Sequence, residues 1–256
     1  MYFSQPGALF MSLFCLGSGY RVLVVGGVGD IGAAIVRAFL HSGCEVIATG
    51  VDRAALSTSS LGPHANLTVA PLDVTSDAEI AEFIGNIDRL DALVNCAGIL
   101  ARFDEFRLET FQRVLDVNLT GTFRMCSACR PLLARGRDQP SSIVNIASTN
   151  AYAALPSIPA YCASKGGVVM LTKSLALAWA AEGIRVNAVA PGYVETSINA
   201  EGRKDAEHYS RIAERIPRGY WAQPHDIAGS VVFLCTQVAN YITGTVLAVD
   251  GGFLAG

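Results

Sequence analysis

The stretch from Arg21 to Ser42 constrains the fold more than any other part of the chain. A short apolar run, Arg21–Val25, leads directly into the glycine-rich sequence Gly26–Gly32 (GGVGDIG), and a helical pattern then runs from Ile31 to about Ser42. A strand, a glycine turn and a helix in this order are the setting in which a pyrophosphate binds. Glycines let the backbone approach the phosphates, and the helix N-terminus supplies N–H donors. A tight turn without a ligand is the alternative.

The rest of the chain repeats the alternation of strand and helix. Apolar, β-branched runs predict further strands at 45–49, 67–70, 92–95, 142–147, 185–189 and 241–249. Helical patterns predict helices at 76–85, 109–133, 160–182 and 205–216, and Pro224 opens one more. Ser76 is expected to cap the first of these helices, with Glu79 completing a capping box. We therefore expect a single α/β domain with a doubly wound, mostly parallel seven-stranded sheet and helices on both faces, a Rossmann-like fold.

Small and polar residues that end the predicted strands are expected to meet at one edge of the sheet. In open α/β sheets, ligands bind outside the carboxyl ends of the strands. The order of the elements places five such residues there, namely Gly26, Asp73, Asn95, Ser148 and Pro191. Five signals that are weak one by one therefore converge on one cleft.

Length and composition favour one enzyme-sized domain over a nucleic-acid or membrane protein. The 256 residues divide into an N-terminal extension (1–11) and one domain (12–256), which contains a substrate segment (193–223). A net charge of −3 without a basic cluster argues against nucleic acid. The first twenty residues lack the charged start of a signal peptide and the uninterrupted apolar run of a membrane span. We expect no membrane partner.

The seven cysteines are typical of a protein in a reducing compartment. Most of them lie inside apolar elements, which suits reduced thiols and a cytoplasmic location better than a disulfide framework. Cys126 and Cys129 form one CxxC pair on a helical stretch. Zinc usually takes four ligands from two such pairs, so we expect no metal.

The residues best suited to catalysis follow the predicted strand 142–147. Ser148 closes that strand, and Tyr161 and Lys165 stand four residues apart at the start of a helix, which puts them on one face. A nearby ammonium favours the phenolate, so we expect the pKa of Tyr161 to be lowered. The predicted chemistry is proton transfer at an alcohol or ketone oxygen that Ser148 also contacts. A Tyr-x-x-x-Lys pair on its own is common in helices without a function.

Taken together, these motifs resemble the short-chain dehydrogenase/reductase family in its compact form. The resemblance runs from about Ser12 to the C-terminus. Its marks are the Gly26–Gly32 turn, Asp73-Val74, Asn95-Cys96-Ala97-Gly98, Asn118, Ser148, Tyr161-x-x-x-Lys165, Pro191-Gly192 and Asp250-Gly251-Gly252. It implies an NAD(P)-dependent oxidoreductase that interconverts a secondary alcohol and a ketone by hydride transfer.

The resemblance also implies a role for each matching residue. Tyr161 would be the general acid/base, Ser148 would hydrogen-bond the reacting oxygen, and Lys165 would hold the nicotinamide ribose. Asn118 would bind a water that relays protons to solvent. Asp73 would face the adenine, Asn95 the adenosine, and Pro191-Gly192 the nicotinamide. The implied cofactor-binding set is Gly26, Asp30, Ile31, Gly32, Val51, Asp52, Asp73, Val74, Asn95, Ala97, Gly98, Tyr161, Lys165, Pro191, Gly192 and Val194.

Three positions depart from the family pattern. Val25 stands where the family has a threonine whose hydroxyl braces the glycine turn. Asp30 replaces the middle glycine, where it could cap the helix. Its carboxylate would lie close to the cofactor phosphates, so we expect it to rotate away. Cys96 replaces the second asparagine of an Asn-Asn-Ala-Gly turn, which is a tolerable packing change.

The preferred cofactor follows from the end of the second strand, where an acidic residue would hold the ribose 2′-OH of NAD. Gly50 and Val51 occupy that place, and Gly29 stands where NADP users often carry a basic residue. Asp52 or Arg53 could substitute for either role. Because no cation is positioned for a 2′-phosphate, we expect a weak preference for NAD over NADP.

Substrate identity is expected to depend on the substrate segment. Tyr193, Tyr209, Tyr220 and Trp221 either wall a pocket there or pack the segment itself. The C-terminal sequence resembles that of polyol and sugar-acid dehydrogenases of the family. The resemblance further implies a homotetramer, with the helices from Glu109 and Ala160 in the main dimer contact. One alternative is a catalytically silent dinucleotide sensor or scaffold. A sugar-nucleotide epimerase shares the Tyr–Lys pair but needs a larger second domain.

Overall fold

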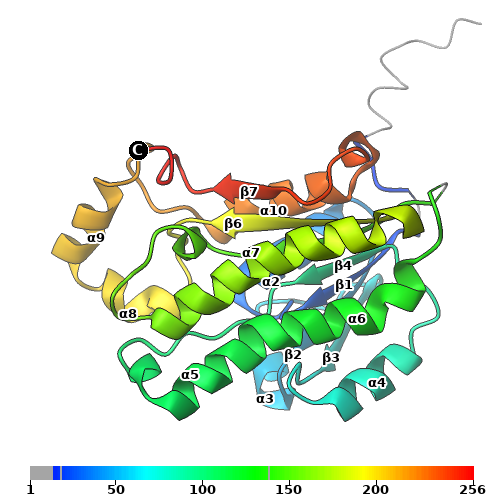
Figure 1. Cartoon of the computed structure of the whole chain (residues 1–256), viewed down its shortest axis with the longest axis horizontal. Coiled ribbons are helices and arrows are strands. Elements are labelled where there is room, and N and C mark those ends of the chain that lie inside the picture. Colours follow the sequence, from blue (N-terminus) through cyan, green and yellow to red (C-terminus); the bar gives the residue numbers. More distant parts are fainter. Residues whose placement is uncertain (1–13, 18, 138) are drawn as a thin grey trace, which may run out of the picture.

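The computed structural model describes residues 14–17, 19–137 and 139–256, so the predicted extension (1–11) lies outside the described residues. Seven parallel strands form one sheet in the order β3-β2-β1-β4-β5-β6-β7 (Figure 1). The strands are β1 (Arg21–Val25), β2 (Glu45–Gly50), β3 (Leu67–Pro71), β4 (Ala92–Asn95), β5 (Ser141–Ile146), β6 (Ile184–Pro191) and β7 (Val246–Val249). The predicted doubly wound single-domain fold is confirmed.

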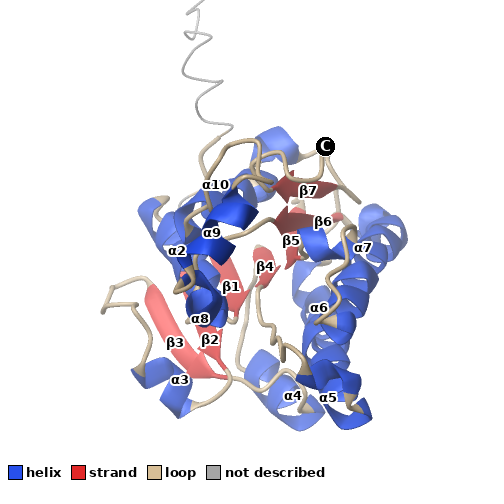
Figure 2. Cartoon of the chain, turned by 90° about the vertical axis from the view of Figure 1, so that its left-hand side faces the viewer, coloured by secondary structure: helices blue, strands red, loops and turns tan. Residues whose placement is uncertain are grey.

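Helices cover both faces of the sheet, as Figure 2 shows. One face carries α2 (Asp30–His41) and α10 (Pro224–Cys235), which pack against each other. The other face carries α4 (Asp77–Gly85), α5 (Leu108–Leu115), α6 (Gly121–Leu133) and α7 (Pro159–Trp179). Three shorter helices, α3 (Arg53–Ser57), α8 (Ala200–Arg203) and α9 (Ala206–Ala213), lie in connections, and Pro224 opens α10 as predicted.

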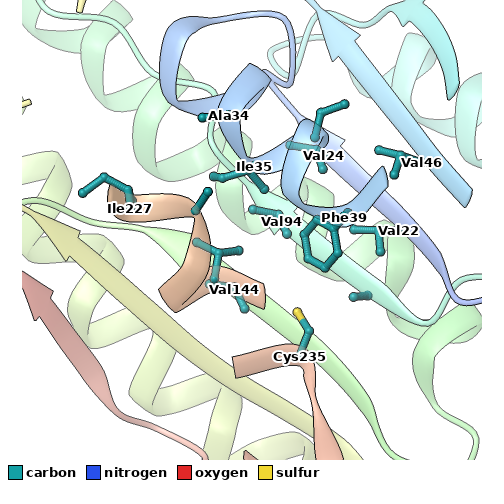
Figure 3. Close-up of a cluster of buried hydrophobic side chains, with 14 of the residues drawn as sticks. Val22, Val24, Ala34, Ile35, Phe39, Val46, Val94, Val144, Ile227 and Cys235 are labelled. Atoms are coloured by element: carbon teal, nitrogen blue, oxygen red, sulfur yellow. The ribbon is translucent and has the colours of Figure 1, made fainter. Parts of the chain in front are cut away.

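The core is split into two layers by the sheet, because successive side chains of a strand point to opposite faces. Val22 and Val24 of β1 pack with Ile35, Phe39 and the buried side of α10 (Figure 3). Leu23 of β1 packs on the other side, in a cluster with side chains of α6 and α7. Strands buried on both faces are typical of parallel sheets, and they hold the strand ends rigidly.

Three expectations about the elements need correction. The predicted helix 109–133 is continuous but contains a π-helical turn, Asp116–Thr120, between α5 and α6. The predicted last strand begins only at Val246, because the chain turns at Gly244 with φ of 76°. The capping box of α4 is half formed: Ser76 accepts from the Glu79 N–H, but Glu79 accepts from Asp73.

None of the helices in the described residues is both long and apolar enough to cross a bilayer.

Candidate active site

A cavity of about 1140 Å³ opens at the carboxyl ends of β1, β4, β5 and β6. Its lining includes the glycine turn after β1, Gly98 after β4, Ser148 after β5 and Gly192 after β6. The substrate segment closes its far side with residues between Tyr193 and Trp221. Ligand pockets for drug-sized molecules measure roughly 300–1,000 Å³, so this cavity has room for a large ligand together with a small one.

The glycine turn leaves space that only a bare backbone can line. Gly26 has φ of 75°, and a Cβ there would lie 2.6 Å from the Ala97 nitrogen. A Cβ on Gly32 would lie 2.1 Å from the Gly26 oxygen. The first N–H groups of α2 have no partner within the helix. This cradle fits the pyrophosphate of a dinucleotide, with anions stabilised at the helix N-terminus.

A hydroxyl from the neighbouring strand braces this turn. Val25 is buried and carries no hydroxyl, but Thr49 of β2 accepts the Gly26 N–H at 3.3 Å. Thr49 is itself buried. Sequence analysis missed this residue because the contact joins two strands that are adjacent only in the sheet. The loss expected at Val25 is therefore offset by a hydroxyl from β2.

Asp30 does not cap α2, the role that the sequence left open for it. Gly29 is the cap residue, and Asp30 is the first residue of the helix. The Oδ2 of Asp30 accepts both the backbone N–H and the hydroxyl of Ser197, each at 2.7 Å. Because both donors lie in the substrate segment, the carboxylate is turned toward that segment.

Ser148, Tyr161 and Lys165 all line the cavity. Ser148 follows β5 and is hydrogen-bonded to Tyr161, whose ring lies 5.6 Å from the Lys165 Nζ. Lys165 is buried, and its Nζ donates to the Ile146 oxygen at 2.7 Å. The spacing of four residues along α7 therefore produces the predicted juxtaposition of phenol and ammonium.

The expected lowering of the Tyr161 pKa is contradicted. Burial raises the pKa of Tyr161 to about 12, and the hydrogen bond with Ser148 only partly opposes this. Burial also lowers the pKa of Lys165 to about 8. Desolvation disfavours the charged form of each group and is the largest cause of both shifts. The phenol is therefore protonated at neutral pH, which suits it to donate a proton to a carbonyl oxygen.

Asn118 lies in the π-helical turn and is completely buried. Its amide accepts from the Ile99 N–H at 2.8 Å and donates to the Ile99 oxygen and to the Ser164 hydroxyl. π-helical turns are frequent at functional sites. These bonds fix the loop after β4 against α7, while the water-binding role of Asn118 stays a prediction.

Glu105 is a functional candidate that sequence analysis missed. It is buried, and its two oxygens accept the N–H groups of Ala101 and Tyr161 at 3.0 and 2.9 Å. The Tyr161 N–H belongs to the first turn of α7, where no helical partner exists. Glu105 therefore caps the helix that carries the phenol, and its charge contributes to the raised pKa of Tyr161. The sequence offered only a weak signal for it, an acidic residue shortly before the predicted helix 109–133.

The predicted cofactor residues divide into two groups. Most of those for the pyrophosphate and nicotinamide line the cavity: Gly26, Asp30, Ile31, Gly32, Gly98, Tyr161, Lys165, Pro191, Gly192 and Val194. Val51, Asp52, Asp73, Val74, Asn95 and Ala97 are not among the lining residues. The roles proposed for both groups stay predictions.

The residues outside the cavity are held by local contacts. Asp73 accepts from the Thr75 N–H and hydroxyl, and Asp52 caps α3 by accepting from the Ala55 N–H. Asn95 is buried and donates to Asn145 within the sheet. This contact links the ends of β4 and β5.

The aromatic residues of the substrate segment partly fit both predictions, namely that they wall a pocket and that they pack the segment itself. Trp221 is buried, stacks on Tyr209 with centroids 5.2 Å apart, and lies 4.9 Å from Tyr193. These three pack the segment, yet Tyr193 and Trp221 also line the cavity. Tyr220 is exposed and accepts from Arg218.

The fold and this site together define a dinucleotide-dependent oxidoreductase. The family described as enoyl-(acyl carrier protein) reductase matches residues 27–254. The 2-dehydro-3-deoxy-D-gluconate 5-dehydrogenase of Bacillus subtilis is 39% identical over 246 residues, which cover 93% of this chain and 95% of the relative. The D-threitol dehydrogenase of Mycolicibacterium smegmatis is 37% identical over 250 residues, with 92% and 93% covered.

A solved structure shows the same fold. The gluconate 5-dehydrogenase from Burkholderia cenocepacia, in complex with NADP and tartrate, matches with a TM-score of 0.85 and 31% identity over 96% of this chain and 99% of that one. The chain belongs to the short-chain dehydrogenase/reductase family. It is an NAD(P)-dependent oxidoreductase that acts on CH–OH groups. The alternative of a silent sensor loses its motivation, since Thr49 braces the turn and Asp30 has two donors.

Proposed function

We propose that the substrate is a hydroxy acid of sugar-acid size, with its carboxylate at the cationic side of the cavity. Arg102, Arg211 and Arg215 all line the cavity. Arg102 donates to the Ser157 hydroxyl, Arg211 lies against the His208 ring, and Arg215 lies over Phe253. None of the three forms an ion pair with a described carboxylate. Guanidinium groups without a carboxylate partner suit an anionic ligand.

The acidic residues of the lining already have partners. Asp30 accepts from Ser197, Glu201 pairs with Lys204, and Asp205 caps α9. The cationic groups are therefore the ones left for a ligand. Of the three, Arg102 lies on the loop after β4, and Glu105, three residues further on, contacts the backbone of Tyr161.

The nicotinamide cofactor, when bound, accepts or delivers the hydride at the substrate carbon. Tyr161 moves the proton. In the direction of reduction, its phenol donates a proton to the carbonyl oxygen of the substrate, and the C=O π bond is replaced by one new C–H bond and one new O–H bond. Ser148 hydrogen-bonds the phenol and orients that oxygen. Lys165, anchored on Ile146, holds a positive charge beneath the phenol and favours the phenolate left behind.

The experiment compares an aldonic acid with the alditol of the same carbon number. Arg102→Leu is expected to raise the KM for the acid at least about tenfold, because a charge-assisted hydrogen bond contributes about 1.5–3 kcal/mol. The KM for the alditol should stay within about twofold. Arg137→Leu, an exposed arginine outside the cavity lining, is the control. Equal losses for acid and alditol would refute the proposed substrate class.

For the cofactor, we propose a weak preference for NAD. Val51 and the N-terminal end of α3 are exposed, and the Asp52 carboxylate occupies the start of that helix. Arg53 is the nearest candidate for a 2′-phosphate. The Burkholderia relative holds NADP, so the proposal depends on this chain's own residues alone. Binding titrations with both cofactors test it, and tighter binding of NADP would refute it.

We also propose a cytoplasmic homotetramer. Leu108, Phe123, Met170 and Leu177 present exposed apolar side chains on α5, α6 and α7, the helices predicted to form the dimer contact. The thiols from Cys44 to Cys235 form no disulfides, which suits a reducing compartment. Sedimentation equilibrium of the wild type and of Leu177→Lys tests the assembly. A monomeric wild type would refute it.

A further inference from the structure

We propose that Asp30 is a positioning residue that fastens the substrate segment to the cofactor-binding turn. The Oδ2 of Asp30, at the start of α2, accepts two hydrogen bonds from Ser197, which lies 167 residues away. Both residues line the cavity, one on the cofactor side and one on the substrate side. The inference depends on the cofactor cleft assigned above and goes beyond its substrate.

Through these two hydrogen bonds, the side chain of Asp30 directly links the cofactor side of the cavity to its substrate side. Ser197 opens the 3-10 helix Ser197–Asn199, which continues into α8. The N-cap residue of that turn, Thr196, is bonded to Asn199, so the turn is a unit that Asp30 holds at its first residue. Fastening this unit places the neighbouring wall of the substrate segment against the cavity.

The same pair explains how a carboxylate is tolerated beside a pyrophosphate site. A carboxylate free to face the phosphates would repel them, because like charges a few ångströms apart repel each other even in water. Two donors from Ser197 neutralise part of its charge and fix it away from the N–H groups of α2. Binding of the cofactor and positioning of the substrate segment are therefore coupled through one side chain.

The test uses three variants with distinct expected signs. Asp30→Ala removes the acceptor, so the substrate KM should rise about fivefold to tenfold while kcat stays within about twofold. Asp30→Asn keeps an oxygen acceptor without the charge, so it should retain most of the substrate affinity. Without the carboxylate, both should bind NAD and NADP up to about fivefold more tightly, and added salt should reduce that gain.

Ser197→Ala separates the loss of the contact from the loss of the Asp30 charge. It removes one donor and leaves Asp30 charged, so the substrate KM should rise and dinucleotide binding should weaken. Asp30→Ala and Ser197→Ala should not be additive, because they remove the same contact. Hydrogen exchange at residues 194–203, measured without cofactor or substrate, should be faster in Asp30→Ala. Asp77→Ala, an exposed carboxylate in the first turn of α4, is the control.

Unchanged exchange protection at 194–203 together with an unchanged KM in Asp30→Ala would overturn the proposal. Additive changes in the double variant would overturn it as well. A failure of the hydroxy-acid assignment would leave the exchange and dinucleotide-binding results unaffected, so the two proposals are separable.

Discussion

The centre around Tyr161 and the substrate segment border the same cavity, but they are held in opposite ways. Asn118, Glu105 and Lys165 are buried, and their polar atoms reach backbone groups of the loop after β4, of α7 and of β5. The substrate segment is held by one aromatic cluster and by exposed bonds such as that between Asp30 and Ser197.

This difference indicates that proton transfer depends on the buried centre around Tyr161 and that substrate specificity depends on the substrate segment. Proton transfer needs atoms held within a narrow range of positions, which a buried, fully bonded frame supplies. Recognition of a substrate tolerates movement and gains from exposed charges that can be exchanged without disturbing the core. We therefore expect changes in the two regions to affect different quantities.

The largest effect is expected from Tyr161→Phe, which removes the acid/base and keeps the ring. The kcat should fall by about 10²- to 10⁴-fold, the usual contribution of a positioned acid or base. Dinucleotide affinity should change little, because the hydroxyl is not part of the glycine cradle. Steady-state rates and fluorescence titration measure the two quantities. A variant as active as the wild type would remove Tyr161 from the mechanism.

A smaller and local effect is expected from Trp221→Ala in the substrate segment. Truncating a buried tryptophan lowers the free energy of unfolding by about 3–5 kcal/mol. This loss is larger than the local stability of a surface segment, so the segment should unfold locally. Hydrogen exchange should show the segment opening while β4, β5 and β6 stay protected. Tyr220→Ala, an exposed neighbour, is the matched control. A uniform loss of protection across the sheet would show that the two regions are one cooperative unit.

The smallest effect concerns the pH dependence of stability. The pKa of Lys165 is about 8 in the folded protein and has an ordinary value of 10.5, so the unfolded state binds more protons between these values. Stability therefore rises with pH in this window, by at most about 1.4 kcal/mol per pH unit from this group.

Above pH 10, Tyr161 contributes to the pH dependence of stability with the opposite sign. The pKa of Tyr161 is raised from 10.0 to about 12, so the phenol loses its proton more readily in the unfolded state and opposes the gain. Urea titrations at pH 8 and pH 10 on the wild type and Lys165→Met isolate the lysine. Burial also raises the pKa of thiols such as Cys126, which lowers stability above pH 9 in both proteins, so the lysine is seen in the difference between them. Relative to Lys165→Met, the wild type should gain stability from pH 8 to pH 10. An identical pH slope in both proteins would contradict the buried, shifted lysine.

Much of the fold could be predicted because the signals are local. Apolar β-branched runs predicted six strands to within two residues of their observed ends, and the glycine turn was placed correctly after Val25. The last strand was predicted too long because Tyr241 and Ile242 read as strand residues, whereas Gly244 turns the chain there. Within the site, the spacing of Tyr161 and Lys165 was enough to predict that their side chains meet, because residues four apart on a helix are neighbours.

The remaining features depend on contacts between distant parts of the chain and on burial. Sequence by itself determined the parallel sheet, the cradle and the pairing of phenol with ammonium, since each follows from residues close together in the chain. Only the tertiary structure decided that Thr49 braces the turn, that Glu105 caps the helix of Tyr161 and that Asp30 holds Ser197. It also decided that burial raises the pKa of Tyr161, because desolvation depends on every atom packed around the phenol.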